Sequence, residues 1–209
     1  MAESRARTLI LASDYRVPDP RSVWPLLQSR KQELADIGAH RVLLYVSTRD
    51  RGRVLVTMAI RNPEPIVDLL RSRVFFDWFD AVGVQDIPGV FAGEIVEKLD
   101  LTASSEAAPP GIVVGAMASI NDVTALVARV RQAVDRFKAA GIRRVWIYRA
   151  FDDASEVFIL QDIDSEDEAR HWVEDPDVAA EWMAGAGVGA YPPPFVGKFW
   201  HMMHIDEDF

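Results

Sequence analysis

Two tyrosines at matching positions of a repeated segment are the strongest candidates for chemistry in this sequence. Residues 38–45 align with residues 141–148 at a constant offset of 103, so Tyr45 corresponds to Tyr148. A tyrosine joins an apolar ring to a hydroxyl that donates or accepts a hydrogen bond. The two side chains therefore either fill a core with their hydroxyls hydrogen-bonded there, or act as hydrogen-bond donors to a bound molecule.

The alternation of side chains along a strand predicts which residues lie on the same side as these tyrosines. Leu43 and Trp146 share that side on the same strands, and Thr57 shares it on a neighbouring strand. On the last strand of each repeat, the fully apolar positions, such as Phe91 and Phe195, are expected to lie under helices, which turns the remaining residues towards a cavity. The resulting candidate site has Tyr45, Tyr148 and His204 as catalytic residues, and Trp146, Trp200, Lys198, Glu94 and Thr57 as ligand-binding residues.

His201 and His204 lie near an acidic C-terminal stretch, an arrangement that could suggest a metal site. Residues three apart on a strand face opposite sides, so these histidines can share one ion only if the strand has ended or turned helical. The sequence therefore predicts no metal and no resident cofactor. A haem with one of these histidines as its axial ligand stays open as a weaker alternative.

Two other motifs have structural explanations. The acidic run 162–168 is typical of a helix start, where negative charge meets the positive end of the helix dipole. The glycine-rich run 185–189 has no strand before it and no helix after it, so it is expected to be a loop rather than a phosphate-binding motif.

The repeat extends along most of the chain and divides it. Asp50 matches Asp153 at the offset of 103, and Gly93 matches Gly197 at an offset of 104. A small, polar, proline-ended stretch separates the two copies. We expect a first unit at residues 1–102, a linker at 103–110 and a second unit at 111–209.

Both copies predict the element order β-α-β-β-α-β, which is the ferredoxin-like unit with both helices on one face of an antiparallel sheet. In the second copy either Asn121 or Asp122 can cap the first helix, and Gly141 stops it. Ser165 with Glu168 forms a capping box before the second helix. Each sheet would leave aromatic residues uncovered, so the two sheets are expected to cover each other. The predicted fold class is α+β: two tandem ferredoxin-like repeats whose antiparallel sheets face each other as a barrel.

The chain resembles the dimeric α+β barrel superfamily, here with both units on one polypeptide. The residues that carry the resemblance are Asp164–Trp172, Asp175–Asp177, Trp182–Met183 and Gly187–Val188. This stretch is similar to one in small barrel proteins related to the antibiotic biosynthesis monooxygenases. The superfamily also includes haem-binding dismutases and peroxidases, polyketide cyclases and proteins without a known reaction, so the resemblance implies a fold more firmly than an activity.

Composition limits the partners. The 209 residues carry a net charge of −9, and the acidic excess lies in the second half. An acidic half repels polyanions, so neither nucleic acid nor an anionic membrane is expected as a partner. The absence of cysteine excludes disulfides and thiol catalysis. No signal peptide or membrane span is recognised at the N-terminus, which predicts a cytoplasmic protein.

Two hypotheses about function remain from the sequence. In the first, suggested by the resemblance, the barrel is a cofactor-independent monooxygenase or cyclase acting on a small aromatic or polyketide-like compound. Tyr45 and Tyr148 then donate hydrogen bonds, His204 is the general acid or base, and Trp146 and Trp200 stack on the substrate. In the second, a non-catalytic barrel holds a small apolar molecule or is filled by its own side chains. The chain forms an intrachain pseudo-dimer in either case, and further homodimerisation stays open.

Overall fold

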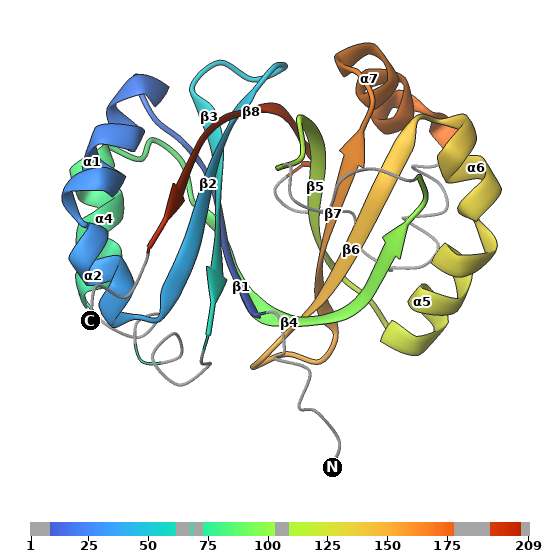
Figure 1. Cartoon of the computed structure of the whole chain (residues 1–209), viewed down its shortest axis with the longest axis horizontal. Coiled ribbons are helices and arrows are strands. Elements are labelled where there is room, and N and C mark those ends of the chain that lie inside the picture. Colours follow the sequence, from blue (N-terminus) through green and yellow to red (C-terminus); the bar gives the residue numbers. More distant parts are fainter. Residues whose placement is uncertain (1–8, 62–67, 69–72, 103–108, 178–192, 206–209) are drawn as a thin grey trace.

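Eight antiparallel strands close into a barrel with the helices outside it (Figure 1). The structure is a computed structural model, and it describes residues 9–61, 68, 73–102, 109–177 and 193–205. The strand order around the barrel is β1-β3-β2-β8-β5-β7-β6-β4. The strands are β1 (Leu9–Arg16), β2 (Ala39–Ser47), β3 (Arg53–Ile60), β4 (Gly89–Asp100), β5 (Ile112–Ser119), β6 (Ile142–Ala150), β7 (Glu156–Ile163) and β8 (Phe195–His204).

The helices lie in two groups on opposite sides of the barrel (Figure 1). In the first half they are the short 3-10 helix η1 (Pro20–Ser22), α1 (Val23–Ser29), α2 (Lys31–Asp36) and α4 (Arg73–Val82). In the second half they are α5 (Val123–Gln132), α6 (Val134–Ala139) and α7 (Glu166–Glu174). Both halves therefore have the order β-α-β-β-α-β, and the predicted α+β barrel of two ferredoxin-like halves is confirmed.

The last strand of each half joins the two sheets. β4 pairs with β1 of its own half and with β6 of the other. β8 pairs with β5 of its own half and with β2 of the other. We call β4 and β8 the exchanged strands, because each pairs with a strand of the other half. They leave no unpaired sheet edge, since each sheet continues into the next.

Local sequence signals explain where the second-half helices begin and end. The Asp122 carboxylate accepts hydrogen bonds from the backbone N–H groups of Thr124 and Ala125, and Ser165 Oγ accepts one from that of Glu168. Gly141 has a φ of +74°, which glycine adopts without steric cost and which ends the preceding helix. These caps confirm the predicted helix starts.

Buried apolar side chains form three clusters. Two lie between a sheet and its own helices, and the third fills the barrel between the sheets. On the second and third strands of each half, alternation correctly predicts which side chains face the barrel interior. Leu43, Tyr45 and Tyr148 belong to the barrel cluster, whereas Val42 and Val145 lie under helices. The predicted orientation of β2, β3, β6 and β7 is therefore confirmed.

The predicted orientation of the last strands is wrong before the bulge in each strand and correct beyond it, where Leu99 and Met203 lie under helices. Phe91 and Phe195 lie inside the barrel, with Phe199 packed against the same cluster, rather than under helices. A bulge then interrupts each strand: the pairing register shifts between Ile95 and Glu97 on β4, and opposite Leu44 and Tyr45 on β8. One inserted residue reverses the alternation beyond the bulge.

Several expectations lie outside the described residues. They concern most of the linker (103–108), the part of the resemblance at Trp182–Met183 and Gly187–Val188, and the glycine-rich run 185–189. The division into units at 103–110 stays a prediction. In the described part of the chain, no helix has the length and apolarity needed to cross a membrane.

Candidate functional site

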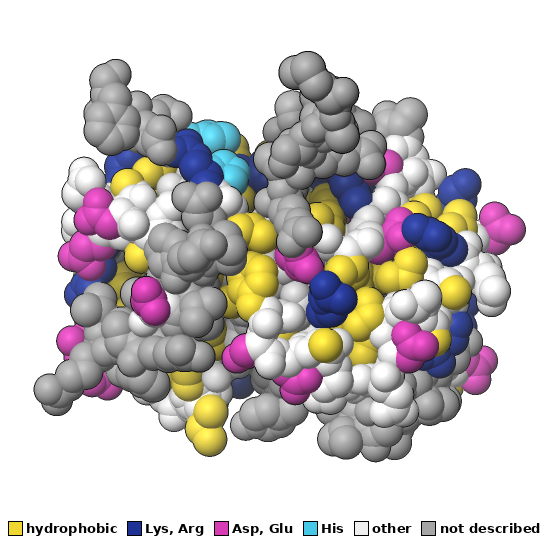
Figure 2. All heavy atoms as spheres, turned by 90° about the horizontal axis from the view of Figure 1, so that it is seen from below, with side chains coloured by type: hydrophobic (Ala, Val, Ile, Leu, Met, Phe, Trp, Pro, Cys, Tyr) yellow, Lys and Arg dark blue, Asp and Glu magenta, His cyan; other side chains and the backbone are white. Residues whose placement is uncertain are grey.

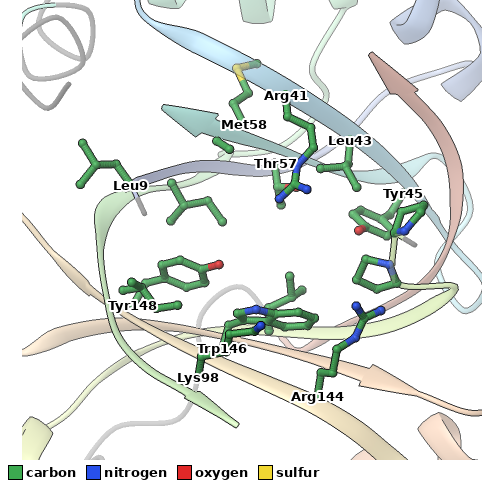
Figure 3. Close-up of a pocket in the computed structure, with 16 residues that line it drawn as sticks. Leu9, Arg41, Leu43, Tyr45, Thr57, Met58, Lys98, Arg144, Trp146 and Tyr148 are labelled. Carbon is green, nitrogen blue, oxygen red and sulfur yellow. The ribbon is translucent and has the colours of Figure 1, made fainter. Parts of the chain in front are cut away.

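A pocket opens at the end of the barrel where β2 and β6 begin. Its volume is about 240 Å³, and it is lined mostly by apolar residues, together with arginine, lysine, threonine and tyrosine side chains from both halves of the chain (Figure 3). Four of the predicted site residues line it: Tyr45, Tyr148, Trp146 and Thr57. Ligand pockets for drug-sized molecules usually measure about 300–1,000 Å³, so this one suits a smaller molecule.

The two tyrosine rings are fixed by packing, and their hydroxyls are turned into the pocket (Figure 3). Tyr45 is 1% exposed and meets Phe199 edge-on, with 6.1 Å between ring centroids. Tyr148 is 6% exposed and stacks on Phe158 at the same centroid distance. Two phenol groups are thus held rigidly beside one space.

Burial raises the pKa of both tyrosines well above its ordinary value near 10. For Tyr45, the nearby Asp162 carboxylate raises the pKa further, while Arg41 lowers it. A raised pKa keeps the phenol protonated at neutral pH. Both hydroxyls are therefore neutral groups able to donate a hydrogen bond to an oxygen atom in the pocket.

Three cationic side chains, Arg41, Arg144 and Lys98, line the same pocket. Arg144 is buried and forms an ion pair with buried Asp162, with Nη2 and Nε 2.6 and 2.8 Å from the same oxygen, Oδ2. The Arg144 guanidinium also lies 5.2 Å from the centroid of the Trp146 ring. Lys98 Nζ lies 3.0 Å from Asp100 Oδ2. The pocket combines apolar walls with a positively charged mouth.

These cations were absent from the predicted site, although the sequence held a signal for two of them. Arg41 and Arg144 occupy matching positions of the repeat and share the alternation of Tyr45 and Tyr148. Extending the same alternation to the start of each strand identifies both. Lys98 could not be found in this way, because the bulge on β4 lies between it and the predictable part of the strand.

The structure does not place the other four predicted residues in the pocket lining. Glu94 lies on the outer surface, where its Oε1 is 2.7 Å from Arg149 Nη2. Trp200 packs against the helix-covered cluster of the first half, and Lys198 and His204 are exposed. The assignment is corrected for two physical reasons. Phenylalanines fill the barrel interior along β4 and β8 before the bulges, so Glu94 and Lys198 lie on the other face. Beyond its bulge β8 turns His204 to the same side as Arg41, but at the exposed end of the strand and outside the lining.

None of the described residues that line the pocket is a histidine. His204 is the cross-strand neighbour of Arg41 but is not among the lining residues. Figure 2 shows histidine side chains on the outside of the molecule beside basic ones. Within the described ranges, no three His, Cys, Asp or Glu side chains gather as metal ligands would. The described lining therefore offers no axial ligand for a haem iron, and a pocket of about 240 Å³ is small for a porphyrin.

A closed eight-stranded barrel made of two ferredoxin-like halves, with a pocket between the sheets, defines the dimeric α+β barrel class, and the chain has this fold. Neither the models of known families nor the curated proteins gave a match. Solved structures do match. One described as an anthrone oxidase-like protein is 13% identical, with a TM-score of 0.71, covering 100% of this chain and 98% of the other.

Two further structures show the range of the class. An uncharacterized ferredoxin-fold protein related to antibiotic biosynthesis monooxygenases, from Listeria monocytogenes, is 10% identical, with a TM-score of 0.50 over 96% of this chain and 99% of that one. A chlorite dismutase from Candidatus Nitrospira defluvii is 10% identical, with a TM-score of 0.58 over 94% and 92%. At these identities the similarity establishes the fold alone.

Proposed function

We propose that this barrel is a cofactor-independent monooxygenase- or cyclase-like enzyme, and that its substrate is a small aromatic or polyketide-like compound bound in the pocket between the sheets. The observation that carries the proposal is the convergence of two protonated tyrosine hydroxyls, Tyr45 and Tyr148, on a space that Arg41 also borders. Similarity to a structure described as anthrone oxidase-like supports it at the level of fold.

The geometry suits an oxygen atom that becomes negative during the reaction. An anthrone loses a proton from the ring methylene opposite its carbonyl, and a 1,3-diketone loses one from the carbon between its carbonyls. Either loss forms a conjugated enolate, whose oxygen bears much of the charge. Fixed hydrogen-bond donors and a nearby cation stabilise such an oxyanion without reorganising. Reaction of the enolate carbon with O₂ then converts a methylene into a carbonyl and releases water, without an external reductant. Attack of the same carbon on a second carbonyl is the corresponding cyclisation.

The lining also bears on how the proton is lost. Among the described residues that line the pocket, none is a carboxylate or an imidazole. His204, which the sequence suggested as the general acid or base, is exposed outside it. The proposal is therefore that the substrate is acidic enough to ionise in water, and that the protein binds and orients its anion.

Oxygen consumption with anthrone and 1,3-diketone substrates tests the proposal. The Tyr45→Phe/Tyr148→Phe double variant should lower turnover about 100-fold, because an oxyanion donor contributes roughly that much. The control is Lys198→Ala, which removes an exposed side chain outside the pocket and should leave turnover unchanged. Equal turnover in the double variant and the native protein contradicts the assigned role of the tyrosines.

A second candidate, a non-catalytic binding protein, is favoured by the same lack of a base in the lining and by the small pocket volume. Native mass spectrometry of the purified protein separates the two proposals. A small molecule that is retained but not converted during turnover assays supports binding alone. A Soret band after haem addition would instead support the haem alternative.

A further inference from the structure

Arg41 and Arg144 are equivalent in the repeat, but their charges meet different neighbours. On β7 the cross-strand partner of Arg144 is Asp162, and the two side chains form a buried ion pair. On β3 the cross-strand partner of Arg41 is Ala59, the residue equivalent to Asp162. The carboxylate that neutralises the arginine in one half is therefore replaced by a methyl group in the other.

The Arg41 charge is directed at the pocket. In the described part of the chain, its side chain has neither an ion pair nor a hydrogen bond to another protein group. Figure 3 shows this side chain extending into the pocket. Its charge favours the ionised form of both Tyr45 and Tyr148, so it lies close enough to act on both hydroxyls.

The remaining charged groups of the mouth compensate one another. Asp162 faces Arg144, and Asp100 lies 3.0 Å from Lys98. Among the described residues that line the pocket, counting each of these pairs as neutral leaves one positive charge, that of Arg41. A pocket with one uncompensated cation matches a ligand with one negative charge.

The pocket is also asymmetric in its apolar walls. Trp146 in the second half occupies the position that Leu43 occupies in the first. A flat indole face is thus available on one side, and the uncompensated guanidinium lies on the other. A guanidinium binds a carboxylate through two parallel hydrogen bonds, whereas an indole favours an aromatic ring.

We propose that the pocket selects a small aromatic monocarboxylate and holds it in one orientation, with its carboxylate at Arg41 and its ring against Trp146. This inference rests on the proposed function, since it names the substrate class of the same pocket. The hydroxyls of Tyr45 and Tyr148 donate hydrogen bonds to oxygen atoms of the bound molecule. Asp162 disfavours the reversed orientation by repelling a carboxylate from the second half.

Isothermal titration calorimetry with 2-naphthoate and 2-naphthamide tests the inference, because the two probes differ in charge but hardly in shape. The native protein should bind the acid about tenfold more tightly than the amide, because a charge-assisted hydrogen bond is roughly twice as strong as a neutral one. Arg41→Gln should remove this preference and leave the amide affinity within about threefold. Arg41→Lys should restore part of the preference, because it keeps the charge but loses the fork geometry.

A matched pair of substitutions at Ala59 probes the asymmetry itself. Ala59→Asp supplies the carboxylate that the first half lacks and should abolish the preference for the acid. Ala59→Asn has nearly the same volume without the charge and should retain the preference. Circular dichroism shows whether each variant folds. If Ala59→Asp does not fold, the comparison of the native protein with Arg41→Gln decides instead, because Arg41 is exposed and its replacement does not disturb the core.

The outcomes separate this inference from the function on which it rests. Equal affinity for acid and amide in the native protein, or a preference that survives in Arg41→Gln, overturns the anion selectivity but leaves an aromatic-binding pocket. Binding of neither probe to the native protein overturns the inference as a whole, and the oxygen-consumption assay still decides the proposed function by itself. Loss of both affinities in Ala59→Asn as well as Ala59→Asp would show an effect of size, and it would overturn the assigned role of the missing carboxylate.

Discussion

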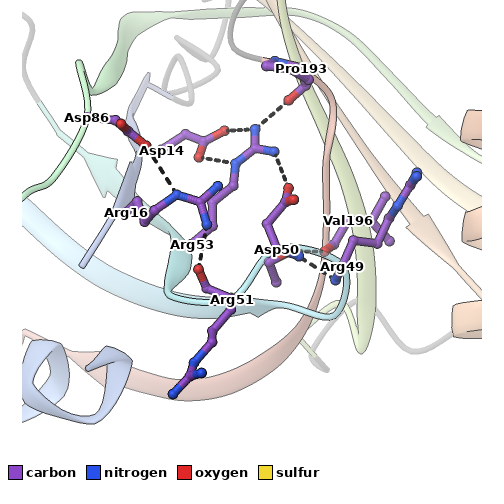
Figure 4. A network of polar contacts seen from close by, with 10 residues as sticks. Asp14, Arg16, Arg49, Asp50, Arg51, Arg53, Asp86, Pro193 and Val196 are labelled. Carbon is purple, nitrogen blue, oxygen red and sulfur yellow. Dashed lines mark hydrogen bonds and ion pairs between the residues drawn. The ribbon is translucent and has the colours of Figure 1, made fainter. Parts of the chain in front are cut away.

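Arg53 and Asp14 face each other inside the barrel at the end opposite the pocket (Figure 4). Arg53 Nη2 lies 2.7 Å from Asp14 Oδ2, and Arg53 Nε donates to Oδ1 at 2.8 Å. Arg53 also forms an ion pair with Asp50 at 2.9 Å and donates to the backbone carbonyl of Pro193. A polar network therefore occupies this end of the barrel, whereas an open pocket occupies the other.

Removing the Asp14 charge should destabilise the fold strongly. In Asp14→Asn the Arg53 guanidinium stays buried with only part of its compensation, because Asp50 is the remaining carboxylate. Breaking a buried ion pair on one side costs about 3 kcal/mol or more. We expect the free energy of unfolding, measured by urea denaturation, to fall by about that amount.

A neighbouring surface pair supplies the control. Arg16 Nε lies 3.1 Å from Asp86 Oδ2, but the Asp86 side chain is 66% exposed. Exposed pairs contribute about 1 kcal/mol at most, so Asp86→Asn should change stability little. Similar losses in Asp14→Asn and Asp86→Asn would contradict a structural role for the buried network.

The buried tyrosines predict a loss of stability at alkaline pH. Burial raises the pKa of Tyr15, Tyr45 and Tyr148 above 10, whereas an unfolded tyrosine ionises near pH 10. Above pH 10 the unfolded chain therefore binds fewer protons than the native protein, and stability falls as the pH rises. The expected slope is about 1.4 kcal/mol per pH unit for each of these tyrosines.

Absorbance at 295 nm checks this prediction in a Tyr191→Phe background, which leaves these three tyrosines as the only ones in the chain. Tyrosinate absorbance should appear together with the loss of native circular dichroism. Ionisation near pH 10 in a protein that keeps its native spectrum would show that these phenols are not held in a low-dielectric environment.

The sequence predicts the fold well because the repeat and the alternation are physically simple. Each of β2, β3, β6 and β7 has one side under helices and one inside the barrel, and Tyr45 and Tyr148 follow from that alternation. The caps at Asp122 and Ser165 depend on neighbouring residues alone, so they too can be predicted from the sequence.

The sequence does not predict the last strands, for two physical reasons. The barrel interior is as apolar as the layer under the helices, so the apolar character of Phe91 and Phe195 does not decide which face they occupy. The bulges at Val96 and Trp200 add a residue without any change in composition. This is why the sequence predicts Glu94, Lys198 and Trp200 in the pocket, although the structure places all three outside its lining.

A pair of tryptophan variants tests the corrected assignment. Trp200 packs against the helix-covered cluster, so Trp200→Ala should lower the free energy of unfolding by about 2 kcal/mol and leave the affinity for 2-naphthoate unchanged. Trp146 lines the pocket, so Trp146→Ala should weaken that affinity about tenfold, because the aromatic contact is lost. Urea denaturation and calorimetry measure the two effects. The reverse pattern would place Trp200 in the binding site after all.

Two glycines allow the exchanged strands to pass between the sheets, and their replacement should be costly. Gly93 on β4 and Gly197 on β8 are equivalent in the repeat, and each has paired strands on both sides. A Cβ at Gly93 would collide with the carbonyl of Arg149, and one at Gly197 would lie 2.6 Å from that of Val46. A backbone carbonyl held in a ladder cannot move aside cheaply, so each alanine substitution should destabilise the barrel by about 2 kcal/mol or more.

Gly111 provides the matched control for these two variants. It precedes β5, and a Cβ there would meet nothing within 4 Å. Gly111→Ala should therefore leave the midpoint of urea denaturation nearly unchanged, while Gly93→Ala and Gly197→Ala lower it. The two costly substitutions act on strand pairs between different halves, β4 with β6 and β8 with β2, so they should also loosen the pocket and weaken 2-naphthoate binding. Native stability in both variants would mean that the barrel does not close through these strand pairs.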